Sequence, residues 1–62
     1  MTLNVGSKYI LRFNIKGAEL VYHAIIKEDD GILITFVDKF DKELTYNRSV
    51  LITAEEINGG GQ

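Results

Sequence analysis

The stretch YILRFNIK, from Tyr9 to Lys16, sets the structural class of this chain, because its side chains alternate in character from one residue to the next. One set is large and apolar: Tyr9, Leu11, Phe13 and Ile15. The other set is mostly polar: Ile10, Arg12, Asn14 and Lys16. Alternation with a period of two residues is typical of a β-strand with one buried face. The stretch therefore predicts a strand, and similar patterns after it predict an all-β protein.

Lys16-Gly17 fits a two-residue hairpin loop, with glycine at the second position, where a positive φ is required. The run that follows, from Glu19 to Lys27, is rich in β-branched and aromatic residues and favours a second strand. The length of the loop fixes the pairing register. It places Ile15 opposite Ala18, Phe13 opposite Leu20, Leu11 opposite Tyr22, and Tyr9 opposite Ala24.

Asp29-Asp30-Gly31 is the next turn signal, and it predicts a three-residue hairpin loop with its glycine in the left-handed conformation. This loop places Glu28 opposite Ile32 and Ile26 opposite Ile34. The third strand is then expected over residues 32–38.

The second half of the chain predicts two shorter strands. Phe40-Asp41-Lys42 forms a turn, Glu43 to Asn47 a fourth strand, and Val50 to Ala54 a fifth. The polar residues Asn47-Arg48-Ser49 fit one 3-10 turn between these strands. Thr53-Ala54-Glu55-Glu56 matches a helix-capping pattern, so a short helix is the alternative to a longer fifth strand. We expect the strand, because a helix there would span barely one turn before the glycines.

The predicted register divides the side chains of the first three strands between two faces. One face is wholly apolar or aromatic and is the expected core: Tyr9, Leu11, Phe13, Leu20, Tyr22, Ala24, Ile26, Ile32, Ile34 and Phe36. The other face is about half apolar and supplies the candidate partner-binding residues: Ile10, Val21, His23, Ile25, Leu33, Thr35 and Val37. Either barrel curvature covers part of this second face, or it is a binding or oligomer surface. In the second case we expect at least two of its five large apolar residues to be exposed in a single protomer and buried on association.

Composition excludes several kinds of site. The chain has 62 residues, a formal net charge of −2, one histidine and no cysteine. A structural zinc site usually needs three or four nitrogen or sulfur ligands, so no metal site is expected. The sequence contains no P-loop, dinucleotide-binding fingerprint or nucleophile elbow, so we expect no cofactor, no catalytic residue and no enzymatic activity.

We expect residues 1–58 to form a single small β-barrel domain and residues 59–62 to form a flexible, glycine-rich tail. No apolar run approaches the roughly 18 residues of a membrane helix, and the N-terminus lacks the basic and apolar parts of a signal peptide. We therefore expect a cytoplasmic protein with no membrane partner, which the absence of cysteine fits.

Five short strands joined by hairpins, with a break of about one turn before the last, resemble the SH3-like small-barrel superfamily. The entry to the first strand, Val5 to Tyr9, is similar to that of many such barrels. Among them, Sm-like proteins have a Gly-x-x-Leu stretch that Gly17-Ala18-Glu19-Leu20 resembles, and a strand–turn–strand ending that residues 44–52 resemble. The resemblance implies a five-stranded SH3-like small barrel, an antiparallel meander with a short 3-10 turn before the last strand. It transfers no RNA-binding residue, because the loop at residues 28–31 lacks the asparagine of the Sm-like family.

Two functions are compatible with these observations. The first is a non-enzymatic interaction module that binds a protein partner or associates with itself through the second face. The alternative is a single-stranded nucleic-acid-binding barrel that stacks aromatic rings on bases beside basic side chains: Lys39, Phe40, Lys42, Tyr46 and Arg48. Without Glu55 and Glu56, the nine acidic residues become seven, against seven basic ones. This neutral body lacks a positive field, which disfavours the alternative.

Overall fold

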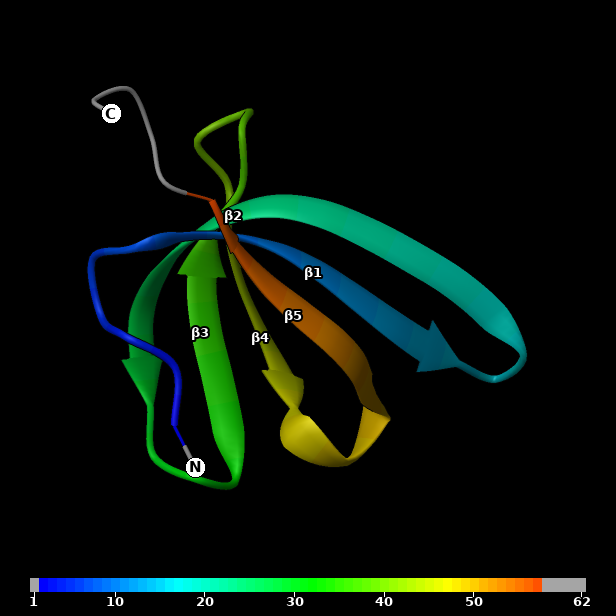
Figure 1. Ribbon diagram of the computed structural model, residues 1–62. Helices are drawn as coiled ribbons and strands as arrows, with labels where there is room; N and C mark the ends of the chain where they lie inside the picture. The colour runs from blue at the N-terminus through cyan, green and yellow to red at the C-terminus, as the bar shows by residue number, and fades with distance from the viewer. Residues whose placement is uncertain (1, 58–62) are drawn as a thin grey trace.

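The computed structural model describes residues 2–57, which form one antiparallel sheet with the strand order β4-β3-β2-β1-β5 (Figure 1). The elements have these bounds: β1 Lys8–Ile15, β2 Ala18–Asp29, β3 Leu33–Val37, β4 Glu43–Asn47, the 3-10 turn η1 Arg48–Val50, and β5 Leu51–Ile57. The all-β prediction is confirmed, while the predicted tail at 59–62 lies outside the described residues. Within the described part of the chain, no helix has the length and apolar character that crossing a membrane requires.

The first hairpin has the loop and register that the sequence predicts. Lys16 and Gly17 connect β1 to β2, and both have a positive φ, at 53° and 85°. Two positive φ values match the turn type that suits the twist of the flanking strands. The side chain of Asn14 accepts a hydrogen bond from the Gly17 amide at 3.1 Å. All predicted pairs are present: Ile15 with Ala18, Phe13 with Leu20, Leu11 with Tyr22, and Tyr9 with Ala24.

The register of the second hairpin was predicted wrongly. Ile26 lies opposite Phe36 rather than Ile34, and Glu28 lies opposite Thr35 rather than Ile32. A bulge at Lys27 separates these two pairs. Because one extra residue reverses the alternation of a strand, the bulge keeps Ile26 on the buried face although the pairing beyond it has shifted.

The turn of this hairpin also begins later than predicted. Its loop is Gly31-Ile32, closed by a hydrogen bond of 3.2 Å from the Asp30 amide to the Leu33 carbonyl. The Asp30 carboxylate fixes the turn, since it accepts from the amides of Ile32 and Leu33 at 2.8 and 2.7 Å. The hydrogen bond from the Leu33 amide, and to a smaller degree the one from the Ile32 amide, lowers the pKa of the Asp30 carboxyl below its ordinary value. Ile32 is therefore at the tip of the turn, 66% exposed, and not in the core where the sequence analysis placed it.

Of the last two strands, only β5 differs from the prediction, in where it begins and ends. β4 has the predicted bounds, and the side chain of Asn47 caps η1 by accepting a hydrogen bond of 2.8 Å from the Ser49 amide. β5 begins one residue later than predicted and continues to Ile57. It pairs with β1, with Thr53 opposite Arg12. This pairing uses the backbone groups that a helix would need, so the capping pattern produces no helix.

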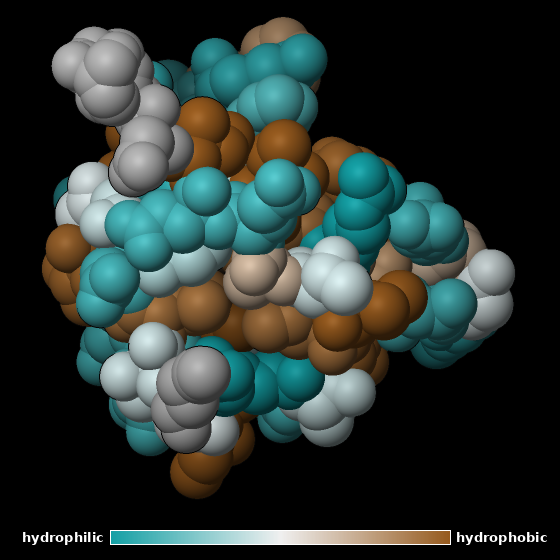
Figure 2. All heavy atoms as spheres, viewed as in Figure 1, coloured by the Kyte–Doolittle hydropathy of each residue, from teal (hydrophilic) through white to brown (hydrophobic). Residues whose placement is uncertain are grey.

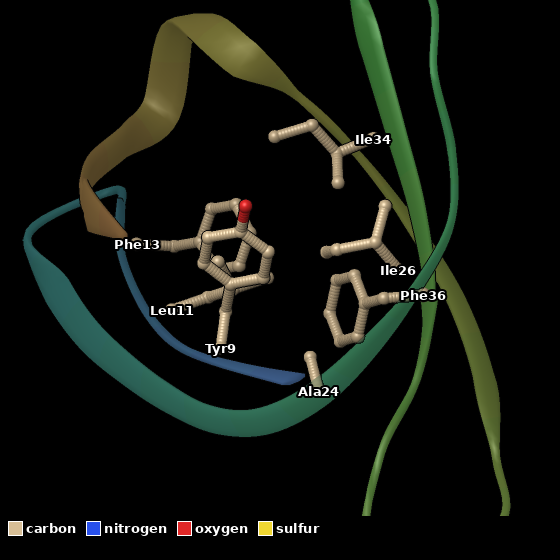
Figure 3. Packing of buried hydrophobic residues seen from close by; sticks show 7 residues of the cluster. All are labelled: Tyr9, Leu11, Phe13, Ala24, Ile26, Ile34 and Phe36. Atoms are coloured by element: carbon tan, nitrogen blue, oxygen red, sulfur yellow. The ribbon is translucent and has the colours of Figure 1, made fainter. Parts of the chain in front are cut away.

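The core lies on the inner face of the curled sheet, where side chains from β1, β2 and β3 point toward one another (Figure 3). Its buried members all belong to the predicted core face: Tyr9, Leu11, Phe13, Ala24, Ile26, Ile34 and Phe36. Leu20 and Tyr22, also predicted, pack against this cluster and are partly buried. The sheet curls enough for Tyr46 of β4 to contact Phe13 of β1, with ring centroids 4.7 Å apart. Within residues 2–57 no ladder joins β4 to β5, so the sheet is open there and barrel closure is not confirmed.

Candidate functional site

The outer face of the sheet exposes large apolar side chains. Val21, Ile25 and Leu33 are 47%, 40% and 43% exposed. Ile10 and Val37, the other two large apolar residues of the predicted second face, are half-buried. Curvature of the sheet therefore leaves much of this face uncovered. The expectation that at least two of these five residues are exposed is confirmed for the single chain.

Cross-strand pairing gathers some of these residues into a row across the whole sheet. From β4 to β5 the row contains Glu43, Val37, Ile25, Lys8 and Ile57. Directly opposed side chains on one face lie close enough to interact, and a lysine stem covers apolar surface while its ammonium group stays in water. The middle of the row is therefore a mainly apolar strip. His23, opposite Ile10, lies beside it.

A groove of about 550 Å³, called here the outer-face groove, lies along this row. Its apolar lining comes from four strands and includes two residues of the core, Tyr9 and Ala24, together with Ile25, Val37 and Ile57. Its charged lining comes from the start of β1 and from the β3–β4 hairpin: Lys8, Asp38, Lys39 and Asp41. Figure 2 shows hydrophobic surface at the foot of this hairpin, with hydrophilic side chains around it. The groove thus has an apolar lining with charges of both signs.

The tip of the β3–β4 hairpin is a turn closed by side-chain and backbone hydrogen bonds. The Asp38 carboxylate accepts hydrogen bonds from the amides of Phe40 and Lys42, at 2.8 and 3.0 Å. Asp41 adopts the left-handed conformation that this turn needs, with φ of 67°. The turn presents Phe40 to solvent, 78% exposed, with the Lys39 ammonium 5.4 Å from its ring centroid.

The groove contains only part of the predicted partner-binding set. Three of its seven residues line the groove: His23, Ile25 and Val37. The other four lie outside that lining: Ile10, Val21, Leu33 and Thr35. Of these, Thr35 interacts with β4 instead, because its hydroxyl is 2.9 Å from that of Thr45. The seven predicted residues therefore lie on one face of the sheet, and the groove covers only the part of that face that contains His23, Ile25 and Val37.

The alternative, nucleic-acid-binding set is not one surface. Three of its residues lie together on the β3–β4 tip: Lys39, Phe40 and Lys42. Tyr46 instead packs in the body, where its ring contacts Phe13 and its hydroxyl is 2.8 Å from that of Tyr22. The hydrogen bond to Tyr46, with burial adding to its effect, raises the pKa of Tyr22 to about 12.

Arg48, the last residue of the nucleic-acid-binding set, forms an ion pair with Asp29. The Asp29 side chain is completely buried, whereas that of Arg48 is 25% exposed. The same carboxylate also accepts hydrogen bonds from the amides of Leu3 and Gly31, at 2.8 and 3.0 Å. Arg48 therefore holds η1 to the β2–β3 turn and the N-terminal segment, and it is poorly placed to contact a phosphate.

Six residues of the groove lining were not predicted as site residues: the core residues Tyr9 and Ala24, and Lys8, Asp38, Asp41 and Ile57. Ile57 follows the alternation Thr53, Glu55, Ile57, so a longer fifth strand would have revealed it. Asp38 and Asp41 join the groove because Val37, just before the hairpin tip, lies opposite Ile25. The predicted register placed Thr35 there instead.

Within residues 2–57 no group of three or more histidine, aspartate and glutamate side chains is placed to hold a metal ion. No protein-family model, curated protein or solved structure matches the chain. The function is therefore argued from the surface that the chain itself presents.

Proposed function

We propose that this chain is a non-enzymatic interaction module that binds a protein partner, or a second copy of itself, through the outer-face groove. One observation carries the proposal: a mainly apolar row crosses the face opposite the core, and its central apolar residue, Ile25, is exposed. Ile25 is 40% exposed, while its neighbour in the chain, Ile26, is fully buried. A contiguous apolar surface with a charged rim is the usual composition of a protein interface.

For the fold we propose an SH3-like small barrel with an open seam between β4 and β5. Three features support this assignment: the meander order β4-β3-β2-β1-β5, the long strand β2 that pairs with both β1 and β3, and the single turn η1 before β5. Folds of this kind carry many unrelated functions, so the groove, and not the fold, supports the proposed activity.

Protein is a better match to the groove than nucleic acid. The three residues of the nucleic-acid-binding set that stay together, Lys39, Phe40 and Lys42, share the hairpin tip with Asp38 and Asp41. The whole chain has a formal net charge of −2. Because phosphate binding depends on clustered positive charge, this surface suits an occupant that is apolar with both signs of charge.

The proposal is tested by the substitution Ile25→Lys, with Ile52→Lys as the matched control. Both replace an exposed isoleucine, 40% and 54% exposed, and only Ile25 lines the groove. We expect both variants to melt cooperatively near the wild-type temperature, because neither side chain belongs to the core. In sedimentation velocity from micromolar to millimolar concentration, Ile25→Lys alone should lose association. Unfolding of Ile25→Lys, or, where the wild type associates, equal association of the two variants, would contradict the proposal.

A further inference from the structure

The large apolar side chain with the greatest exposure in the described chain stands directly beside the groove. Phe40 is 78% exposed, and its neighbours Lys39 and Asp41 both line the groove. An aromatic side chain buries roughly 150–250 Å² when it is covered, so leaving it in water forgoes a large gain. The Asp38 carboxylate fixes the turn through the Phe40 amide, at 2.8 Å. The ring is thus presented with little backbone freedom left to lose on binding.

The groove has the size and chemistry to receive such a ring. Its volume of about 550 Å³ falls within the roughly 300–1,000 Å³ of pockets that hold small ligands. Ile25, Val37 and Ile57 supply the apolar contacts that an aromatic side chain needs. Phe40 is not part of the lining of the groove in its own chain, so the space is open to a ring from elsewhere.

A projecting ring next to a groove makes this patch complementary to itself. An interface with two-fold symmetry requires that property, because the same surface meets itself across the axis. The charges of the patch are also complementary to themselves, because two lysines, Lys8 and Lys39, line the groove together with two aspartates, Asp38 and Asp41. A uniformly acidic or basic partner would match only half of these charges, whereas a second copy can match all of them.

We infer that the occupant of the groove is Phe40 of a second copy of this chain, in a two-fold dimer in which each copy places its ring in the groove of the other. The inference rests on the proposed function and names its partner. Because Lys39 and Asp41 both line the groove, Lys39 of one copy can pair with Asp41 of the other in this arrangement. A stable dimer buries roughly 800 Å² on each partner, which is about a fifth of the 4238 Å² surface of the described chain. One face of a five-stranded sheet can supply that share.

Two variants, alone and mixed, test this arrangement. Phe40→Ala removes the ring and keeps the groove, while Ile25→Lys spoils the groove and keeps the ring. We expect each variant alone to dissociate with a Kd raised roughly 30-fold or more, as for truncation of an aromatic hot spot. Their equimolar mixture should regain association, because the ring of the Ile25→Lys copy still fits the groove of the Phe40→Ala copy. Only one of the two contacts is restored, so the mixed dimer should be weaker than the wild type.

Ile32→Ala is the matched control, since it removes an apolar side chain, 66% exposed, from the tip of a different hairpin. It should leave the dimer intact in the same sedimentation experiment. A mixture that stays monomeric, or a wild type that is monomeric at millimolar concentration, would overturn the inference. If Phe40→Ala associates like the wild type while Ile25→Lys does not, the ring is not the occupant, yet the groove remains the interface and the proposed function stands.

Discussion

Among single side chains, Asp29 joins segments that are distant in sequence. Its buried carboxylate accepts hydrogen bonds from the Leu3 amide, the Gly31 amide and the Arg48 guanidinium. Asp29→Ala leaves these donors without their acceptor, so we expect the free energy of unfolding in urea to fall by about 2–4 kcal/mol. Glu28→Ala removes the exposed carboxylate next to it and should change this free energy by less than about 0.5 kcal/mol. Equal losses in the two variants would contradict the role assigned to Asp29.

Tyr22 links stability to alkaline pH. Its hydrogen bond to Tyr46 raises the pKa of Tyr22 to about 12, whereas an unfolded tyrosine titrates near pH 10. The fold therefore favours the neutral phenol, and this contribution is complete below about pH 10 and is lost as the pH rises through about 12. We expect the wild type to lose stability over this window more steeply than Tyr22→Phe, which has no phenol at position 22 to ionise. Urea denaturation at stepped pH measures the difference, and parallel curves for the two proteins would refute the linkage.

The β1–β2 hairpin is the element most dependent on the conformation of its loop. Lys16 has a φ of 53°, in the left-handed region that is costly for residues with a Cβ atom. Asparagine tolerates this region, and Asn-Gly is a preferred pair for this kind of turn. Lys16→Asn should therefore raise the free energy of unfolding by about 0.5–1 kcal/mol, and Lys16→Val should lower it. Urea titrations of the two variants check the signs, and a destabilised Lys16→Asn protein would show that the loop is not limited by φ.

How well each element was predicted depends on what fixes its ends. The loop and register of the first hairpin were predicted correctly because its loop, Lys16-Gly17, is a strong local signal. In the second hairpin, the side chain of Asp30 and the bulge at Lys27 outweigh the local signal at residues 29–31, and neither is visible in the alternation. In β5, pairing with β1 overrides the helix-capping pattern at residues 53–56.

The groove was predicted in part, for a related reason. His23, Ile25 and Val37 were found because the face of a side chain follows from strand alternation. Asp38 and Phe40 take their roles from the position of the β3–β4 hairpin next to β2, which depends on the bulge and the curl of the sheet. Only the assembled sheet could bring these residues together.

In the molecule as a whole, two phenylalanines occupy opposite environments, Phe36 in the core and Phe40 on the exposed β3–β4 tip. Phe36 is fully buried, while Phe40 is 78% exposed. Phe36→Ala should cost about 3–5 kcal/mol, enough to unfold much of a chain whose total stability is on the order of 5 kcal/mol. Phe40→Ala should leave thermal unfolding of the dilute protein unchanged. Similar melting curves of these two variants, followed by circular dichroism, would show that the core is assigned wrongly.

The outer-face groove and the β3–β4 tip together form the interface that we assign to this protein. A map of backbone amide chemical shifts, recorded as the wild-type chain is concentrated from micromolar to millimolar, tests that assignment. We predict concentration-dependent shifts at His23, Ile25, Val37, Lys39 and Phe40, and none around Ile52 on β5. Shifts that stay constant at every residue, or that change around Ile52 and not in the groove, would contradict it.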